Sequence, residues 1–561
     1  MAGYGKRGSF RNSPDFAVSV TPDRSGPPRA DSLQGLFEAA HYLRQLGQPL
    51  AARSVIAQQA LAHFRSVGDR LGLDPSPYFD TRWYKAQHPD WAETARTAVE
   101  DFLARIDRTA PRAPHPMIDP EFYRKAYPDL AGLGPQAALH FIRHGDAEAR
   151  SPSAVFDAGF YRQTYLPLGT GHPFRHYICE GRARGYLPRP EPRSAEASAR
   201  AMRAALAKLP PARSFLLVAH DAQQAGVPLL TLDLAQALQG RGWQPVFLLD
   251  RGGPLLPRFQ GLGQVFLAAE GWEPGGLARA LPTDTPALIN TGAAARFAPA
   301  LSGAGLRVLV LIHEMTDYLR AQGLIPDLNA AQQAGAGLVV SMPRMVPTLA
   351  DLPEPVGQIL PGVVLPVTPL AAFRALRRKA RPRRAPVFIS AGHADHRKGF
   401  DLFLEAATEL QRQMPKARFV WLGALDPWAQ ALADQARAAG LRLKLPGFVT
   451  DSLAWYRAAD AYLLTSRQDP GPTTVIHAAA MGTPFVGYAA DIGLIGLTEG
   501  MGHFVPPGDL PGFVATARHL ATAGSPAKRR HLRRLVRRAT DFETYVEALL
   551  TRLTRAPDGA A

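Results

Sequence analysis

The chain has 561 residues, a formal charge of +16, one cysteine, and 46% hydrophobic against 20% charged residues. This length exceeds what one hydrophobic core can hold and predicts two to four domains of globular composition. The lone Cys179 excludes an internal disulfide and a zinc site built on several cysteines, so we expect it to pack in a helix. The positive charge favours anionic partners such as nucleic acid, acidic lipid or phosphorylated small molecules, and the excess of Arg and Ala equally fits a GC-rich coding bias.

Residues 1–30 are rich in Gly, Ser, Pro and Arg without periodicity and predict a disordered tail. The first residues are basic and polar but contain no apolar segment, so they do not form a secretory signal. The longest apolar runs, such as 308–312, have the length of strands. We therefore expect a cytoplasmic protein whose membrane contact, if it has one, is peripheral and at the inner face.

Apolar residues at three- and four-residue spacing predict a helical hairpin over residues 31–70, with a break at 47–49. An internal repeat then covers residues 74–190. Its aromatic pairs are spaced by 39 residues (83 to 122) and 38 residues (122 to 160). Three copies of one unit predict a mainly α-helical module. The repeated pairs are Trp83-Tyr84, Phe122-Tyr123 and Phe160-Tyr161.

The second helix of each copy ends near a polar residue followed by an aromatic one, and two copies continue to a glycine that we interpret as a helix stop. Core packing explains the repeated aromatics more simply than a stacking platform for carbohydrate or bases. His140 and His176 are expected to make polar contacts at helix ends rather than to bind a ligand, and the module is a candidate surface for a protein partner. The glycines are Gly145 and Gly181.

From residue 213 onwards, short apolar runs alternate with amphipathic helices, the pattern of parallel sheets covered by helices. The fold class is therefore α/β, with two Rossmann-like lobes preceded by the helical repeat region. The predicted segments are a linker (188–213), an N-terminal lobe (213–370), a hinge (366–386) containing a basic stretch (374–386), a C-terminal lobe (386–540) and a C-terminal helix (541–555).

Ligands of open α/β sheets bind at the carboxyl ends of the strands, so the loops after the strands are the candidate sites. The first loop, 390–400, places Arg397 and Lys398 beside a helix start, with Gly392 and His393 before them. Cations next to free backbone N–H groups predict an anion site that suits a diphosphate.

The second loop lies within 465–488, where Asp469 precedes a helix that carries His477. Thr473 and Thr474 offer hydroxyl and N–H groups at the start of that helix. Polar side chains on both sides of a helix start suit a sugar and its nucleotide.

Two loops of the N-terminal lobe, 220–228 and 312–317, would face the same ligand if the lobes oppose each other. We expect His220, Asp221 and Gly226 to lie on the acceptor side and His313 to lie beside the reacting sugar, although a plain surface loop remains the alternative.

These loops resemble those of retaining glycosyltransferases of the GT-B fold, specifically the large family-4 group that includes bacterial polysaccharide sugar transferases. The resemblance covers residues 213–554 and is strongest in the C-terminal lobe. It rests on the order of GHADHRKG (392–399), PGFV (446–449), RAADAYLLTSRQDP (457–470) and AAAMGTPFVGY (478–488).

The resemblance implies sugar transfer from a nucleotide-sugar to a glycan, lipid-linked or protein acceptor with retention. The family signature is two acidic residues separated by seven others, and here Asp469 holds the first position and His477 the second. By this resemblance His313, Lys398 and Asp469 are catalytic, and His477 contacts the ribose. His393 stands where the family has an arginine, which leaves Lys398 and Arg397 to meet the diphosphate.

No DxD motif lies in a convincing loop, so we expect no metal and no cofactor beyond the nucleotide-sugar substrate. Three alternatives stay open: a scaffold with a degraded pocket, motivated by His477 and His393; a nucleic-acid binder, for which no binding motif is present and which we do not expect; and a non-transferase relative such as a phosphorylase or epimerase.

Overall fold

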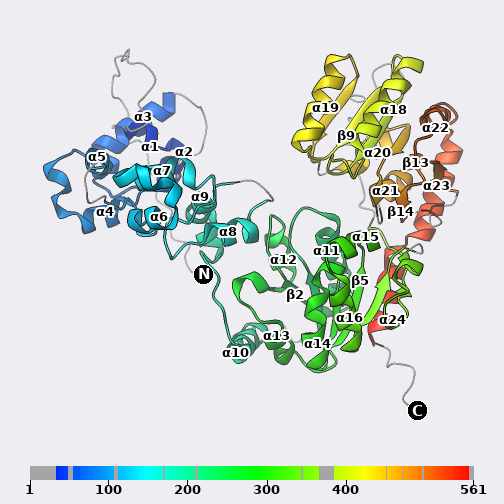
Figure 1. Ribbon diagram of the computed structural model, residues 1–561, viewed down its shortest axis with the longest axis horizontal. Coiled ribbons are helices and arrows are strands. Elements are labelled where there is room, and N and C mark those ends of the chain that lie inside the picture. Colours follow the sequence, from blue (N-terminus) through cyan, green and yellow to red (C-terminus); the bar gives the residue numbers. More distant parts are fainter. Residues whose placement is uncertain are drawn as a thin grey trace, which may run out of the picture. The chain divides into compact units, whose positions relative to one another are not determined.

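The computed structural model describes residues 33–47, 55–106, 112–167, 171–208, 213–342, 345–364 and 385–554, except 450, 470, 472, 494, 496, 497 and 499. The tail predicted at 1–30 and most of the hinge predicted at 366–386 lie outside them. The chain divides into two compact units, 1–191 and 192–561 (Figure 1). Within the described ranges, no helix combines the length and the apolar character that crossing a bilayer requires.

The first unit is built from short helices, as predicted, and several of them continue into single π-helical or 3₁₀ turns. The α-helices are α1 (Leu33–Leu36), α2 (Ala39–Gln45), α3 (Val55–His63), α4 (Thr81–Gln87), α5 (Ala98–Ala104), α6 (Pro120–Ala126), α7 (Ala137–His140), α8 (Ala158–Tyr165) and α9 (Pro173–His176). The π-helical turns are η2 (Phe64–Gly68), η5 (Phe141–Gly145) and η6 (Tyr177–Gly181). The 3₁₀ turns are η3 (Pro89–Glu93), η4 (Pro128–Gln136) and η7 (Arg182–Arg184).

The unit contains a fourth copy of the repeat. Its described residues, 33–47 and 55–70, fall in the segment predicted as a separate hairpin at 31–70. In every copy, the backbone N–H of an acidic residue donates to a proline carbonyl at the start of the following copy or at the end of the module, at 2.9–3.0 Å. The first copy is not apparent from the sequence because His41, and not an aromatic residue, precedes its Tyr42. The bonds are Glu38 to Pro75, Asp80 to Pro114, Asp119 to Pro152 and Asp157 to Pro188.

The predicted core role of the aromatics is confirmed for the second member of each pair, because Tyr84, Tyr123 and Tyr161 are fully buried. The predicted polar contact of the histidines is also confirmed. The Tyr123 hydroxyl bonds His140 Nδ1 at 3.1 Å, and the Tyr161 hydroxyl bonds His176 Nδ1 at 2.8 Å.

The interpretation of Gly145 and Gly181 as helix stops holds for their position, because each is the last residue of its π-helical turn, but neither acts as a left-handed cap. Neither glycine has a positive φ. Each ends a π-helical turn against the tyrosine of its own copy, and a Cβ would lie 2.1 Å from the Tyr123 hydroxyl at position 145 and 1.9 Å from the Tyr161 hydroxyl at position 181. The glycines therefore make room for a buried ring.

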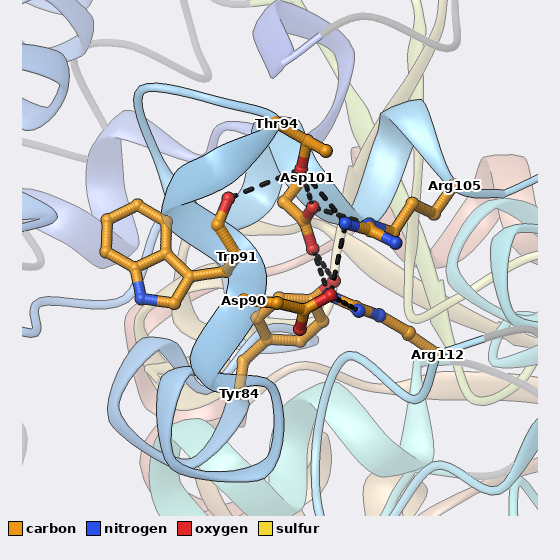
Figure 2. A network of polar contacts seen from close by, with 7 residues as sticks. All are labelled: Tyr84, Asp90, Trp91, Thr94, Asp101, Arg105 and Arg112. Carbon is orange, nitrogen blue, oxygen red and sulfur yellow. Dashed lines mark hydrogen bonds and ion pairs between the residues drawn. The ribbon is translucent and has the colours of Figure 1, made fainter.

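The second copy replaces the histidine with Asp101 and surrounds it with cations (Figure 2). Asp101 accepts hydrogen bonds from the Tyr84 hydroxyl at 2.7 Å, from Arg105 at 2.7 Å and from Arg112 at 2.6 Å. Burial works against the charged carboxylate, but these bonds and one from Thr94 outweigh it and hold the pKa of Asp101 below its ordinary value. A buried carboxylate is thus stabilised by donors on several sides.

The second unit contains two parallel sheets, as the alternating pattern predicted. Its first sheet has the order β3-β2-β1-β4-β5-β6-β7. The strands are β1 (Arg213–Ala219), β2 (Trp243–Leu249), β3 (Gln264–Leu267), β4 (Pro286–Ile289), β5 (Arg307–Ile312), β6 (Gly337–Val340) and β7 (Gly357–Gln358). The helices are α10 (Ala195–Leu206), α11 (Gly226–Gln239), α12 (Leu256–Leu262), α13 (Pro274–Ala280), α14 (Ala298–Gly303), α15 (Thr316–Ala321) and α16 (Ile325–Gln333), with 3₁₀ turns η8 (Ala268–Glu270), η9 (Gly292–Phe297) and η11 (Pro347–Leu349).

The second sheet has the order β10-β9-β8-β11-β13-β15, and β12 pairs with β14 separately. The inner strands β9, β8, β11 and β13 are apolar and buried because helices cover both faces of a parallel sheet, whereas the edge strands β10 and β15 are more exposed. The strands are β8 (Val387–Ala391), β9 (Arg418–Leu422), β10 (Leu443–Gly447), β11 (Ala461–Leu464), β12 (Gln468–Asp469), β13 (Phe485–Tyr488), β14 (Asp491–Ile492) and β15 (Gly502–Val505). The helices are α18 (Phe400–Gln413), α19 (Pro427–Ala438), α20 (Ser452–Ala458), α21 (Thr473–Ala480), α22 (Leu510–Thr522), α23 (Pro526–Ala539) and α24 (Phe542–Thr554).

Two helices at the ends of this unit attach to the first sheet. The segment predicted as a linker, 188–213, contains α10, which is capped by Ser194 and packs its buried Ser198 against Gly276 of α13. The last helix, α24, leaves the second lobe and lies beside β5 (Figure 1). Arg307 there donates to the Thr554 carbonyl at 2.8 Å. The chain thus closes back on its N-terminal lobe.

The contact between the repeat tyrosine and glycine can be tested at Gly145. We expect Gly145→Ala to lower the free energy of unfolding by about 1–3 kcal/mol, because the new methyl group overlaps the Tyr123 ring. Denaturant unfolding of the full chain measures this. Gly132→Ala is the matched control, because a Cβ there meets nothing within 4 Å. An equal loss in both variants would contradict the packing role.

Candidate functional site

Both sheets reverse their strand order at one place. The predicted site loops after β1, β8 and β11 lie at these reversals, and the loop after β5 lies one strand away. In the first sheet the reversal falls between β1 and β4, and in the second between β8 and β11. The carboxyl ends of neighbouring strands on either side of a reversal leave a crevice, which is where open α/β sheets bind ligands. The topology therefore brings the loop after β8 to the loop after β11.

Lys398 and Asp469 meet across these two loops. Lys398 Nζ lies 2.5 Å from Asp469 Oδ2, with the side chains 15% and 5% exposed. The Ser466 hydroxyl donates to the same carboxylate at 3.3 Å. The structure thus joins two residues that the sequence singled out separately, and it holds the lysine by an anion of the protein itself.

Glycines shape the loop that carries Lys398. Gly399 has a φ of +66°, and a Cβ there would lie 2.0 Å from the Thr465 carbonyl oxygen, so only glycine permits this approach to the β11 loop. Gly392 has a φ of +138°, and the Lys398 stem passes it, with Cε 3.3 Å from where a Cβ would be. Asp395 accepts from the Lys398 backbone N–H at 2.7 Å.

The neighbouring cations are tied to the second loop. Arg397 donates to the Gln468 carbonyl at 3.0 Å, and Arg467 forms two bonds of 2.8 and 2.7 Å with Asp401. The side chains of Arg397 and His393 are exposed. Arg397 therefore lies next to the Lys398–Asp469 pair, and its predicted contact with a diphosphate stays a prediction.

The two threonines at the start of α21 differ in their surroundings. The Thr474 hydroxyl bonds the buried Tyr462 hydroxyl at 2.9 Å. Tyr462 also accepts from the Ala391 N–H at 3.1 Å, which links α21 to the end of β8. Thr473 is exposed. Of the two, Thr473 is the side chain open to a ligand.

His477 lies on α21 and bonds the backbone of Val364, the last described residue before the inter-lobe segment. Burial lowers the pKa of His477 to about 4, and the bond to Val364 opposes this shift only in part. One ring nitrogen is therefore engaged within the protein. A ribose contact, as predicted, would have to use the other nitrogen, and it stays a prediction.

The predicted N-lobe residues also converge. His220 follows β1, and its Nε2 lies 3.5 Å from Asp221 Oδ2. His313 follows β5, and its Nε2 lies 2.8 Å from Oδ1 of Asn290, which follows β4. The charge of His220 contributes to the pKa of His313, so the two rings are close. Gly226 begins α11 in the loop after β1.

Sequence reasoning missed Asn290, Ser466 and Tyr462. Asn290 stands directly after the apolar run PALI, where a polar residue ends a strand, and this position is a signal that could have identified it. Tyr462 gave no signal, because an aromatic residue inside a strand is ordinarily core. Within the described residues, no three His, Cys, Asp or Glu side chains gather as metal ligands would.

Comparisons with known proteins support the fold of the second unit. Residues 385–523 match the family model described as Glycosyl transferases group 1. The glycogen synthases of two Mycobacterium tuberculosis strains are 30% identical over 182 residues, which are 30% of this chain. The chain spans about 42% of the length of these curated relatives.

Among solved structures, Anabaena HepE in complex with UDP and glucose aligns with a TM-score of 0.53 at 16% identity, over 62% of this chain and 100% of that one. HepE in complex with UDP-glucose aligns with a TM-score of 0.53 at 17% identity, over 61% and 99%. The fold expected from the resemblance, GT-B with a helical region ahead of it, is thereby confirmed.

The buried His477 predicts an acid-sensitive stability. Its folded pKa of about 4 lies below the ordinary 6.5, so the folded chain binds fewer protons than the unfolded chain between these values. Stability from this group is full above pH 6.5 and falls as the pH drops towards 4. The free energy of unfolding should fall between pH 7.5 and pH 5 in both chains. We expect this fall to be about 2 kcal/mol smaller in His477→Gln than in the unchanged chain, as measured by denaturant unfolding. Parallel losses would contradict the burial of the neutral ring.

Proposed function

We propose that this chain transfers a sugar from a nucleotide-sugar donor to a glycan, lipid-linked or protein acceptor, with retention of configuration. The observation that carries the proposal is the Lys398–Asp469 pair at the strand reversal of the lobe that matches group 1 glycosyltransferases. The complexes of HepE with UDP and UDP-glucose make UDP-sugars the first donors to test.

The proposed chemistry uses the ion pair as an exchangeable contact. A bound diphosphate carries more charge than one carboxylate and competes with Asp469 for Lys398. As the bond from the anomeric carbon to the diphosphate oxygen breaks and the bond to the acceptor oxygen forms, negative charge grows on the diphosphate. Lys398, with Arg397 beside it, stabilises that charge. Asp469 is then free to accept hydrogen bonds from sugar hydroxyls, and the acceptor proton leaves to the diphosphate or to solvent.

The other roles follow the same assignment. His313 lies beside the reacting sugar, His477 and Thr473 contact the nucleotide, and the acceptor binds near His220 and Asp221. We propose that protein cations replace a metal ion and that no cofactor is needed beyond the donor. The repeat unit is proposed as a protein-docking module with no activity of its own.

The decisive experiment is a donor screen by mass spectrometry with the full chain. Lys398→Ala should reduce turnover of the accepted donor by about 10²-fold or more, because it removes the cation at the leaving group. Lys416→Ala is the matched control, since this exposed lysine lies two residues before β9, at the opposite, amino end of the strand.

Two outcomes would replace the proposal. If calorimetry detects no binding of any UDP-, GDP- or dTDP-sugar and no hydrolysis occurs, the scaffold reading is correct, in line with His477 and His393 in place of the usual acidic and basic residues. If a sugar phosphate or an epimerised nucleotide-sugar is the product, the chain is a phosphorylase-like or epimerase-like relative.

We propose the basic surface of α23 as the site of the membrane contact. The helix has no acidic residue, and its buried Leu532 and Val536 place the charges on the opposite face. An anionic lipid surface attracts such a face by about 1 kcal/mol per cation. The exposed basic side chains are Lys528, Arg530, His531, Arg534, Arg537 and Arg538.

Charge reversal tests this contact. We expect Arg530→Glu, Arg534→Glu and Arg538→Glu together to weaken binding to vesicles containing phosphatidylglycerol by tenfold or more in flotation assays, with little binding to phosphatidylcholine alone in either case. The control reverses three exposed arginines on other surfaces. Equal binding by both triple variants would contradict the proposal, and so would tighter binding to RNA than to vesicles. The control residues are Arg124, Arg200 and Arg442.

A further inference from the structure

A buried amide lies beneath the candidate site of the N-terminal lobe. Asn290 is fully buried at the end of β4. Its Nδ2 lies 2.9 Å from Thr231 Oγ1 and 3.3 Å from the Val227 carbonyl oxygen, both on α11. Its Oδ1 lies 2.8 Å from His313 Nε2. Every polar atom of the amide thus has a partner.

The partners determine which way the amide faces. The Val227 carbonyl can only accept a hydrogen bond. The Thr231 hydroxyl donates its single proton to the same carbonyl at 2.8 Å, so its oxygen meets Asn290 as an acceptor. Two acceptors on one side require the NH₂ group there, and a flipped amide would place oxygen against oxygen. Oδ1 of Asn290 therefore faces His313.

The orientation of Asn290 determines the proton position on His313. An acceptor opposite Nε2 requires a proton on that nitrogen. Burial lowers the pKa of His313. The charge of Glu314 raises this pKa and the charge of His220 lowers it. The net effect is a decrease, which keeps the ring neutral near pH 7. A neutral ring with its proton on Nε2 carries a lone pair on Nδ1. Among the described residues, no hydrogen bond engages Nδ1, and the side chain is partly exposed.

We infer that Asn290 is a positioning residue that holds His313 in the tautomer protonated at Nε2, so that Nδ1 accepts a hydrogen bond from a hydroxyl group of the bound substrate. The ligand class is a neutral, hydroxylated sugar, because a lone pair repels a carboxylate or a phosphate at the same place. The substrate part of this inference rests on the proposed function, whereas the tautomer does not.

Nitrogen NMR of the ¹⁵N-histidine-labelled full chain tests the tautomer without any turnover. His313 is assigned by comparison with His313→Gln. We expect a protonated Nε2 and an unprotonated Nδ1 at pH 7 in the unchanged chain. Asn290→Ala should give averaged signals, because the ring then loses its fixed acceptor. A proton on Nδ1 of the unchanged chain would overturn the inference, and so would signals that are identical in the two chains.

Turnover and the conservative variant supply the second readout. In a chain that turns over a donor, Asn290→Ala should lower kcat/KM on the order of 10- to 100-fold, as loss of a supporting contact does at other sites. Asn290→Asp keeps an acceptor opposite Nε2, so it should recover part of this loss at high pH. It should also move the acidic limb of the profile of kcat/KM against pH to higher pH. Equal rates in Asn290→Ala and the unchanged chain would overturn the role in positioning.

Structural damage is separated from positioning by a third variant. Thr231→Val removes one acceptor from the amide side and keeps the Val227 carbonyl, so it should retain the His313 tautomer with a small loss of stability. If no donor is turned over by any variant but the NMR signals are as expected, the proposed function fails and the tautomer assignment stands.

Discussion

Backbone hydrogen bonding in two parallel sheets is the constraint on which the second unit depends. A parallel sheet satisfies its amides only through neighbouring strands, and helices then cover both faces, so polar side chains have room chiefly at the strand ends. Because both sheets reverse their order next to the first strand of the lobe, the loops after β1, β4 and β5, and those after β8 and β11, form the two polar edges. Every candidate site residue except those on α21 and α11 lies in one of these loops.

Within that frame, pairs of buried polar groups set the geometry of the site. Lys398 and Asp469 are each costly to bury alone, and together they lower that cost. In the N-terminal lobe the fully buried amide of Asn290 is likewise stabilised by polar contacts, because it has three hydrogen-bonding partners. In both lobes a residue after one strand fixes a residue after the neighbouring strand, so the side chains are oriented before any ligand arrives.

The first unit follows a different principle. Its copies are too short to bury a face alone. Three of the four place a tyrosine ring against a glycine, and all four direct the tyrosine hydroxyl to a histidine or an aspartate. The second copy shows that the polar partner can change if its charge is neutralised, as Arg105 and Arg112 do for Asp101. The backbone bonds between consecutive copies then repeat with little variation.

The sequence by itself determined the two α/β lobes, the repeat and the loops that hold Lys398 and Asp469, because hydrophobic periodicity and glycine placement are local signals. It did not reveal the copy at 31–70, since the tyrosine of that copy is recognised by its contact with Gly68 and not by its neighbours in the chain. Nor did it indicate that Lys398 pairs with Asp469, that His477 bonds Val364 or that Asn290 supports His313. These pairs are 71, 113 and 23 residues apart, and only the strand order and the approach of the two lobes brought them together.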